Sequence, residues 1–152
     1  MNKHMSDAFP IRSYPYRVFY ADTDAGGVVY YAQYLRMFEQ TRTLYMEDCG
    51  LSLLELANQN CLFVCRRVEV DYQNSARLGD NLLIRTGIAD LAHCYITFAY
   101  EIICSSRMDE EGNPLYIAEG ITQMAAVSEK QERSVLRRIP KPVSAALADQ
   151  KE

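Results

Sequence analysis

Aromatic and aliphatic side chains recur every three to four positions along residues 31–48, which predicts a long helix. One face of this helix is marked by Tyr34, Phe38, Thr41 and Tyr45. Four more apolar residues widen that face around most of the circumference: Leu35, Met37, Leu44 and Met46. A helix that is apolar on most sides needs other elements to cover it, so we expect it in the interior. Gly50 ends the helix, because glycine is favoured just beyond a helix C-terminus.

The flanking segments are typical of strands, tight turns and one short helix. Residues 16–20 form a brief aromatic and β-branched strand, and residues 51–60 form a short helix with Ser52 as N-cap and Glu55 completing a capping box. Four longer strands follow at residues 61–72, 82–88, 93–103 and 115–127, separated by turn sequences at 78–81 and 109–114. One buried helix with a series of strands joined by tight turns predicts an α+β domain. A sheet long enough to curl around the helix would bury it on several sides.

The length of 152 residues suits a single domain, which we assign to residues 13–140. We expect residues 1–12 to be a disordered leader. The chain becomes basic after Lys130 and contains Pro140 and Pro142, so residues 141–152 are predicted as a C-terminal tail on the surface.

Composition narrows the class of function. A net charge of −4 and a pI near 5.2 argue against a general nucleic-acid binder. No apolar run approaches the roughly 18 residues of a membrane span, and the N-terminus lacks the apolar region of a signal peptide, so we expect a cytoplasmic protein. The five cysteines and two histidines show no metal-ligand spacing, which predicts no metal site. A late basic cluster is either solvated surface or a docking patch for a phosphorylated carrier: Lys130, Arg133, Arg137, Arg138 and Lys141.

The strongest chemical signal lies between the first strand and the long helix. Two acids, Asp22 and Asp24, precede the adjacent glycines Gly26 and Gly27, which allow a ligand close to the main chain. The first amides of the following helix, near Tyr31, lack helical partners and favour negative charge. A base beside such a donor is suited to chemistry on a carbonyl. We expect Asp22 to hydrogen-bond the loop and Asp24 to face the substrate pocket. The structural alternatives are that the two glycines only form a tight turn and that Asp24 only caps the helix.

Two stretches resemble a known family. Residues 22–42, DTDAGGVVYYAQYLRMFEQTR, are similar to the signature of hot-dog-fold acyl-CoA thioesterases of the 4-hydroxybenzoyl-CoA thioesterase class, nearest to the bacterial branch associated with the Tol-Pal system. The similarity continues through residues 63–88, FVCRRVEVDYQNSARLGDNLLIRTGI, and weakly to RRIP at residues 137–140. This resemblance implies the hot-dog fold, a five-stranded antiparallel sheet wrapped around one long central helix. It also implies an enzyme without cofactor that forms a homodimer or homotetramer, with active sites at subunit interfaces.

The resemblance further implies roles for two residues. Asp24 matches the family's catalytic carboxylate, which acts as base or nucleophile, and the backbone N–H of Tyr31 matches the donor that polarises the thioester carbonyl. Members of the Tol-Pal-associated branch typically carry histidine where this chain has Tyr31, so the amide is retained and the histidine side chain is lost. Aromatic residues occur at that position in the 4-hydroxybenzoyl branch.

Further residues are candidates for the same site. We predict that Tyr20, Gly26, Gly27, Val28 and Tyr30 bind the substrate, although the two tyrosines could equally serve packing alone. Asp22, Glu39 and Arg42 are supporting candidates. Glu39 and Arg42, three apart on the helix, are expected to form an ion pair; alternatively Glu39 helps to order the site or a subunit interface.

The sequence therefore predicts an acyl-CoA thioesterase that releases the free acid and coenzyme A, with acyl carrier protein as a second candidate carrier. One alternative is a non-catalytic module of the same fold that binds acyl thioesters or acyl carrier protein, in which tyrosine in place of histidine signals lost turnover. Another is a dehydratase acting on a hydroxyacyl carrier. Such enzymes pair a histidine with a carboxylate, and His93 is poorly placed to supply one.

Overall fold

The computed structural model describes residues 2–150; Met1, Lys151 and Glu152, at the ends of the predicted leader and tail, lie outside the described residues. Five strands form one antiparallel sheet in the spatial order β1-β3-β4-β5-β2. They are β1 (Arg12–Arg17), β2 (Leu62–Tyr72), β3 (Asn81–Leu91), β4 (Tyr95–Met108) and β5 (Pro114–Lys130), and a short strand, β6 (Arg133–Leu136), pairs with β5. The helices are α1 (Gln33–Asp48), α2 (Leu53–Asn58) and α3 (Lys141–Ala148). No helix within residues 2–150 is long and apolar enough to cross a membrane.

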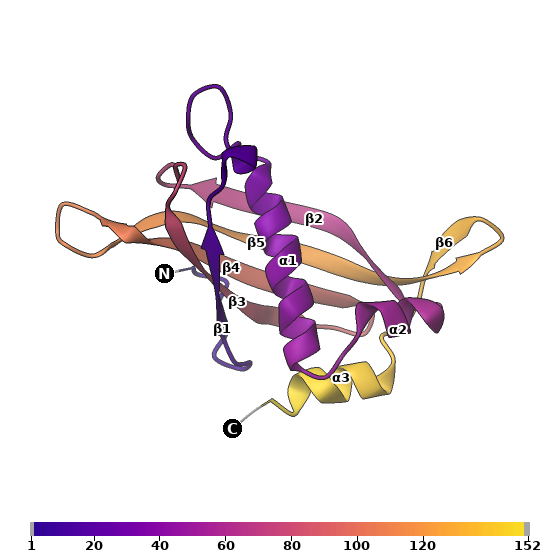
Figure 1. The fold of residues 1–152 in the computed structure, drawn as a ribbon. Coiled ribbons are helices and arrows are strands. Elements are labelled where there is room, and N and C mark those ends of the chain that lie inside the picture. The colour runs from indigo at the N-terminus through magenta and orange to yellow at the C-terminus, as the bar shows by residue number, and fades with distance from the viewer. Residues whose placement is uncertain (1, 151–152) are drawn as a thin grey trace.

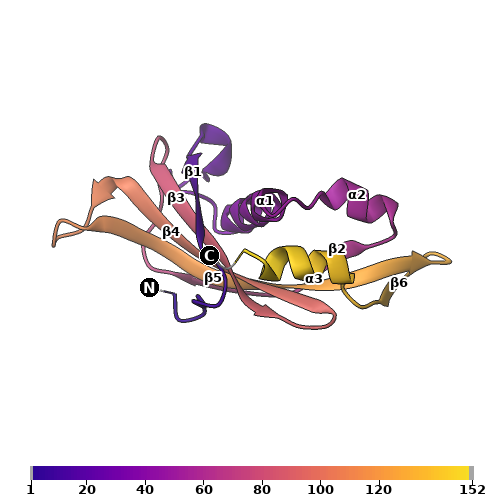
Figure 2. The same ribbon diagram turned by 90° about the horizontal axis from the view of Figure 1, so that it is seen from below.

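Helix α1 crosses one face of the sheet, and α2 and α3 lie near its C-terminal end (Figure 1; Figure 2). One face of α1 is buried as its spacing predicts, since Met37, Phe38 and Tyr45 are 0% exposed. Leu35 and Leu44 were predicted to widen that face, but they are 37% and 42% exposed. The ring of Phe38 stacks on that of Tyr100 in β4, with 4.1 Å between centroids. Gly120 in β5 permits this approach, because a Cβ there would lie 2.9 Å from Phe38 Cε2. The sheet therefore packs against the buried face of one long helix, which confirms the predicted α+β architecture, whereas the opposite face of α1 is exposed and not in the interior as predicted.

The N-terminal segment lies across the face of the sheet opposite α1 (Figure 2). The sequence predicts a disordered leader here, whereas the structure anchors Asn2, which is 2% exposed. Its side-chain amide donates hydrogen bonds to the carbonyls of Tyr100 at 2.8 Å and Gly120 at 3.1 Å. A single polar residue makes this contact, and no hydrophobic periodicity in the sequence points to it.

The C-terminal segment also differs from the predicted surface tail. It forms α3, in which Val143 and Leu147 are buried. Pro142 lies in the first turn of α3, where proline is favoured because the amide that it lacks would have no helical acceptor. Proline therefore starts a helix at this position.

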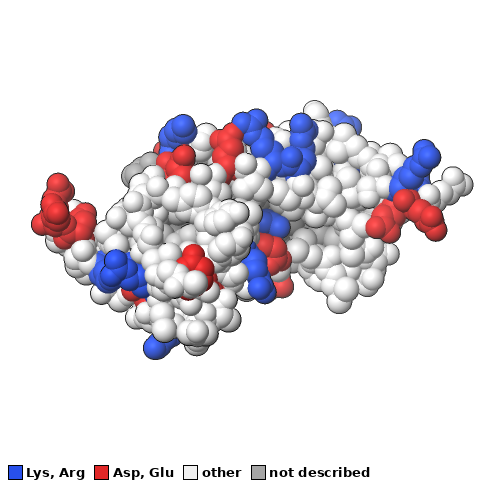
Figure 3. All heavy atoms as spheres, turned by 90° about the horizontal axis from the view of Figure 1, so that it is seen from above, with Lys and Arg blue, Asp and Glu red and all other residues white. Residues whose placement is uncertain are grey.

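The late basic residues do not form one patch. The tip of the β5–β6 hairpin carries both signs of charge (Figure 3), since Glu129 and Glu132 accompany Lys130 and Arg133. Closer to α3, Arg137 donates to the carbonyl of Asn60 at 3.2 Å. The guanidinium of the next residue, Arg138, lies 3.0 Å from Nδ1 of His93. These residues are therefore divided between a hairpin tip and the base of α3.

The first strand begins and ends earlier than the sequence predicts. A strand is predicted over residues 16–20, whereas β1 ends at Arg17 and Tyr20–Asp22 form a 3₁₀ turn. The turn forms because the Asp22 carboxylate accepts a hydrogen bond from the amide of Phe19 at 2.8 Å. The predicted cap of the short helix is confirmed, since the Ser52 hydroxyl accepts from the amide of Glu55 at 3.2 Å.

Candidate active site

The acid-glycine loop is a tight turn that holds the carboxylate of Asp24. The Asp24 amide donates to the carbonyl of Val28 at 2.9 Å, and the amide of Gly27 donates to the carbonyl of Asp24 at 3.0 Å. Gly27 has a φ of +78°, which glycine adopts without strain. The Gly26 amide donates to Asp24 Oδ1 at 2.8 Å, and a Cβ at this glycine would lie 3.1 Å from that oxygen. Both glycines therefore keep Asp24 in an exposed, defined position.

Asp22 has a different environment from Asp24. Its side chain is buried, and its carboxylate accepts hydrogen bonds from the Tyr16 hydroxyl at 2.9 Å, the Phe19 amide at 2.8 Å and Gln33 Nε2 at 2.7 Å. Its carbonyl accepts from the amide of Tyr30 at 2.9 Å. Asp22 thus ties β1, the loop and the start of α1 together. Within residues 2–150, Asp24 Oδ2 accepts no hydrogen bond.

Two amides at the start of α1 have no hydrogen-bond acceptor within residues 2–150. Ala32, which precedes the first helical residue, has no side-chain cap. The carbonyl of Tyr30 accepts from the Gln33 amide at 2.8 Å, and the carbonyl of Tyr31 accepts from the Tyr72 hydroxyl at 2.8 Å. In the described part of the chain, the amides of Tyr31 and Ala32 donate to no protein acceptor. These donors lie at the positive end of the helix dipole, where an anion is stabilised.

An open hollow of about 530 Å³ brings these groups together. It is lined by Asp24, Val28, Val29, Tyr31, Tyr34 and the run from Tyr72 to Ser75. Three of the predicted site residues, Asp24, Val28 and Tyr31, therefore share one surface. The opposite wall of the hollow is formed by residues 72–75, none of which was among the predicted site residues. The sequence feature that could have pointed to this wall is the polar run directly after the predicted strand at residues 61–72.

The wall is held by contacts to other strands. Arg107 of β4 donates to the carbonyl of Ser75 at 2.6 Å and forms an ion pair with Asp80 at 2.7 Å. Burial raises the pKa of the Asp80 carboxyl, but hydrogen bonds from Arg107 and from the Arg77 amide outweigh burial, and the pKa is lowered. The carbonyl of Ala76 accepts from the Val29 amide at 2.8 Å, which joins the wall to the loop. The hollow is therefore built on both sides by fixed backbone.

Other predicted site residues lie outside the lining of this hollow. Tyr20 is 81% exposed in the 3₁₀ turn, and the Tyr30 ring packs against that of Tyr31 with 4.7 Å between centroids. Gly26 and Gly27 act through the turn described above rather than as lining residues.

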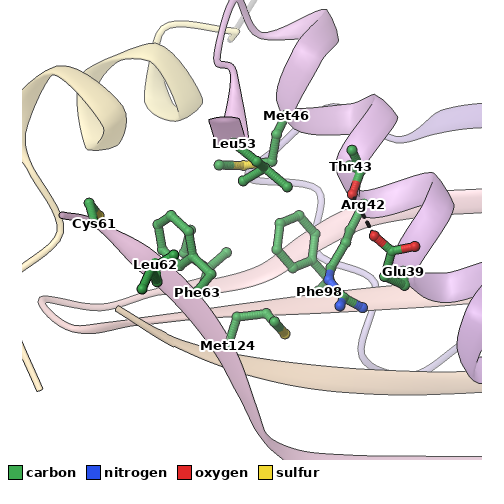
Figure 4. A pocket seen from close by; sticks show the side chains of 11 residues that line it. Glu39, Arg42, Thr43, Met46, Leu53, Cys61, Leu62, Phe63, Phe98 and Met124 are labelled. Atoms are coloured by element: carbon green, nitrogen blue, oxygen red, sulfur yellow. Dashed lines mark hydrogen bonds between the residues drawn. The ribbon is translucent and has the colours of Figure 1, made fainter. Parts of the chain in front are cut away.

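The prediction that Glu39 and Arg42 form an ion pair is wrong. Glu39 accepts a hydrogen bond from the Thr43 hydroxyl at 3.1 Å, one helical turn further on. Arg42 reaches from α1 toward the sheet and lies beside Phe98 (Figure 4). Both residues line a separate cavity of about 190 Å³ under the C-terminal half of α1. Three-residue spacing permits a pair, but here the two side chains take different directions.

The fold and the site have counterparts in known proteins. A family model described as the thioesterase-like superfamily matches residues 18–147. The chain belongs to this superfamily. The acyl-CoA thioesterase YbgC of Haemophilus influenzae is 33% identical over 135 residues, covering 88% of this chain and 92% of that protein. The acyl-CoA thioester hydrolase YbgC of Escherichia coli O6:H1 is 39% identical over 90 residues, covering 59% of this chain and 67% of that protein.

A solved structure extends the comparison. A mutant of 4-hydroxybenzoyl-CoA thioesterase, complexed with 4-hydroxybenzoyl-CoA, is 15% identical, with a TM-score of 0.80 over 90% of this chain and 98% of that chain. At this identity the likeness shows the fold alone. The predicted hot-dog fold and the predicted relationship to these thioesterases are both confirmed. The relatives' names class the chain with thioester hydrolases.

Proposed function

We propose that this protein hydrolyses acyl-CoA thioesters, with Asp24 as base or nucleophile and the Tyr31 amide as the donor to the thioester carbonyl. The observation that carries this proposal is that Asp24 and Tyr31 line one open hollow. Among the described residues, Asp24 Oδ2 accepts no hydrogen bond and the Tyr31 amide donates none. The names of the relatives, all acyl-CoA thioesterases or thioester hydrolases, support the substrate class.

Two routes use these groups. In the first, Asp24 Oδ2 takes a proton from water, and the hydroxide attacks the thioester carbonyl. In the second, Asp24 attacks the carbonyl itself, and water then hydrolyses the mixed anhydride. Both develop negative charge on the carbonyl oxygen, which the Tyr31 amide and the dipole of α1 would stabilise. The C–S bond breaks, coenzyme A leaves as a thiolate that then takes up a proton, and the acyl group leaves as a carboxylate.

We also propose a second carrier of the acyl group and an oligomeric state for the protein. Acyl carrier protein is the second proposed carrier, and Arg137, Arg138 and Lys141 at the base of α3 are the candidate contacts. A homodimer or homotetramer is supported by β2, an edge strand whose outer edge has no partner within residues 2–150. Val64 and Val68 on this strand are 42% and 40% exposed. A cytoplasmic location stays a prediction from the sequence.

The test is release of free thiol from a panel of acyl-CoA substrates, running from short to long aliphatic and aroyl groups. Asp24→Asn should lower kcat by about 10²–10⁴-fold, because it removes a positioned base or nucleophile. The matched control is Asp90→Asn, an exposed acid on β3 whose loss should leave kcat unchanged.

Turnover that survives in Asp24→Asn would remove this residue from the mechanism. No turnover of any substrate by the wild-type protein would favour the non-catalytic binding module instead. Binding of a non-hydrolysable thioether analogue of acyl-CoA would then measure that role directly.

A further inference from the structure

Tyr72 connects the far wall of the hollow to the helix start. It is the last residue of β2, and its hydroxyl donates to the carbonyl of Tyr31 at 2.8 Å. Its ring lies against that of Tyr34, with 5.5 Å between centroids. Burial and, to a lesser extent, the Coulomb interaction with the neighbouring Tyr31 phenol raise the pKa of Tyr72. The hydroxyl therefore stays protonated at neutral pH and remains a donor.

The hydrogen bond from Tyr72 matters because the start of α1 has no capping side chain. A helix normally begins at a side chain that caps its first amides, but Ala32 offers no such group. The first turn of α1 is held by two backbone bonds, from Gln33 to Tyr30 at 2.8 Å and from Leu35 to Ala32 at 3.1 Å, and by the Gln33 side chain, which donates to Asp22 at 2.7 Å. An uncapped first turn is prone to fraying. Movement here would displace the Tyr31 amide relative to Asp24, which lines the same hollow.

We propose that Tyr72 is a positioning residue for thioester hydrolysis, which fixes the peptide between Tyr31 and Ala32 so that the Tyr31 amide keeps its place in the hollow. This inference rests on the proposed function of Asp24 and Tyr31. Both carbonyls that flank the Tyr31 Cα accept hydrogen bonds, one from Gln33 and one from Tyr72. A carbonyl that accepts a hydrogen bond strengthens the N–H of its own peptide group as a donor, so the bond from Gln33 to Tyr30 also polarises the Tyr31 amide.

The variant Tyr72→Phe removes only the hydrogen bond from the Tyr72 hydroxyl to the Tyr31 carbonyl. Phenylalanine keeps the ring beside Tyr34 and loses only the hydroxyl. We expect kcat to fall about fivefold, which corresponds to about 1 kcal/mol, the net contribution of one hydrogen bond. KM should change by less than about twofold, since the lost bond holds a donor that matters most when charge develops on the carbonyl oxygen.

The matched control is Tyr14→Phe, at the other end of α1. The Tyr14 hydroxyl donates to Asp48 Oδ2 at 2.7 Å, a bond of similar length between β1 and the last residue of the helix. This variant should leave kcat unchanged. Equal losses of kcat in the two variants would show a general effect on α1 and overturn the positioning role of Tyr72.

Amide hydrogen exchange provides a readout that is independent of turnover. In Tyr72→Phe, the amides of Gln33 and Leu35 should exchange about fivefold faster, and in Tyr14→Phe they should not. If the wild-type protein releases no thiol, the proposed function fails, and exchange still decides whether Tyr72 anchors the helix start. If the wild-type protein is active but Tyr72→Phe has unchanged kcat, the proposed function stands and the positioning role is refuted.

Discussion

Asp22 and Asp24 are two residues apart, yet the structure predicts opposite consequences when each becomes asparagine. Asp22 is 4% exposed, and all three of its side-chain hydrogen-bond partners are donors. Asp24 is exposed, and within residues 2–150 its carboxylate accepts a single hydrogen bond, from the amide of Gly26. We therefore expect Asp22→Asn to reduce stability and Asp24→Asn to reduce turnover with little change in stability.

The magnitude for Asp22→Asn follows from its partners. Oδ1 accepts from Tyr16 and Gln33, and Oδ2 accepts from the Phe19 amide. In asparagine, the oxygen can accept from the Phe19 amide while the NH₂ group faces the Tyr16 hydroxyl and the Gln33 side-chain amide, both of which must then rotate to accept. A hydrogen bond to a charged group contributes about 1.5–3 kcal/mol and a neutral one about 0.5–1.5 kcal/mol, so each of the three bonds is weakened by about 1 kcal/mol or more when the carboxylate is lost. We expect the free energy of unfolding to fall by about 2–5 kcal/mol.

Thermal unfolding followed by circular dichroism would measure this loss. For a chain of this size, each kcal/mol lowers Tm by about 2–4 °C, so Asp22→Asn should melt at least about 4 °C below wild type. Asp24→Asn should melt within about 2 °C of wild type. An unchanged Tm in Asp22→Asn would refute the assignment of Asp22 as the residue that ties β1, the loop and α1 together. A large loss in Asp24→Asn would show that this acid also supports the fold.

Two further predictions concern the sheet and the wall of the hollow. Gly120→Ala should destabilise the protein by about 1–3 kcal/mol, because the new Cβ would lie 2.5 Å from the carbonyl oxygen of Glu69. In the control Gly87→Ala, the nearest atom is Ile11 Cγ1 at 3.3 Å, and urea unfolding that ranks the two variants equally would contradict this packing argument. The lowered pKa of Asp80 implies a stabilisation that is complete above the unfolded-state pKa of about 3.9 and is lost as pH falls further. Urea unfolding between pH 6 and 3 should therefore show a decline that is shallower in Asp80→Asn, and identical slopes would argue against the contribution of the Arg107 pair.

Much of the fold was predictable because it depends on local periodicity. The spacing of apolar residues predicted α1 to within two residues of its start, and alternation with turn residues predicted β2 to β5. The ends of the chain were predicted less well. Asn2 binds the sheet through its amide, and α3 buries only Val143 and Leu147, so neither segment has a strong hydrophobic pattern.

The sequence by itself determined the half of the candidate site that is local in the chain. Asp24 and Tyr31 are seven residues apart across one glycine turn, so short-range backbone bonds suffice to place them on one surface. Only the tertiary structure decided the other half. The Tyr72 hydroxyl and the Tyr31 carbonyl are separated by 41 residues, and sheet pairing brings them together. The direction of Arg42 likewise depends on the surface beneath α1, because a side chain on a helix has several rotamers and packing against other elements selects one.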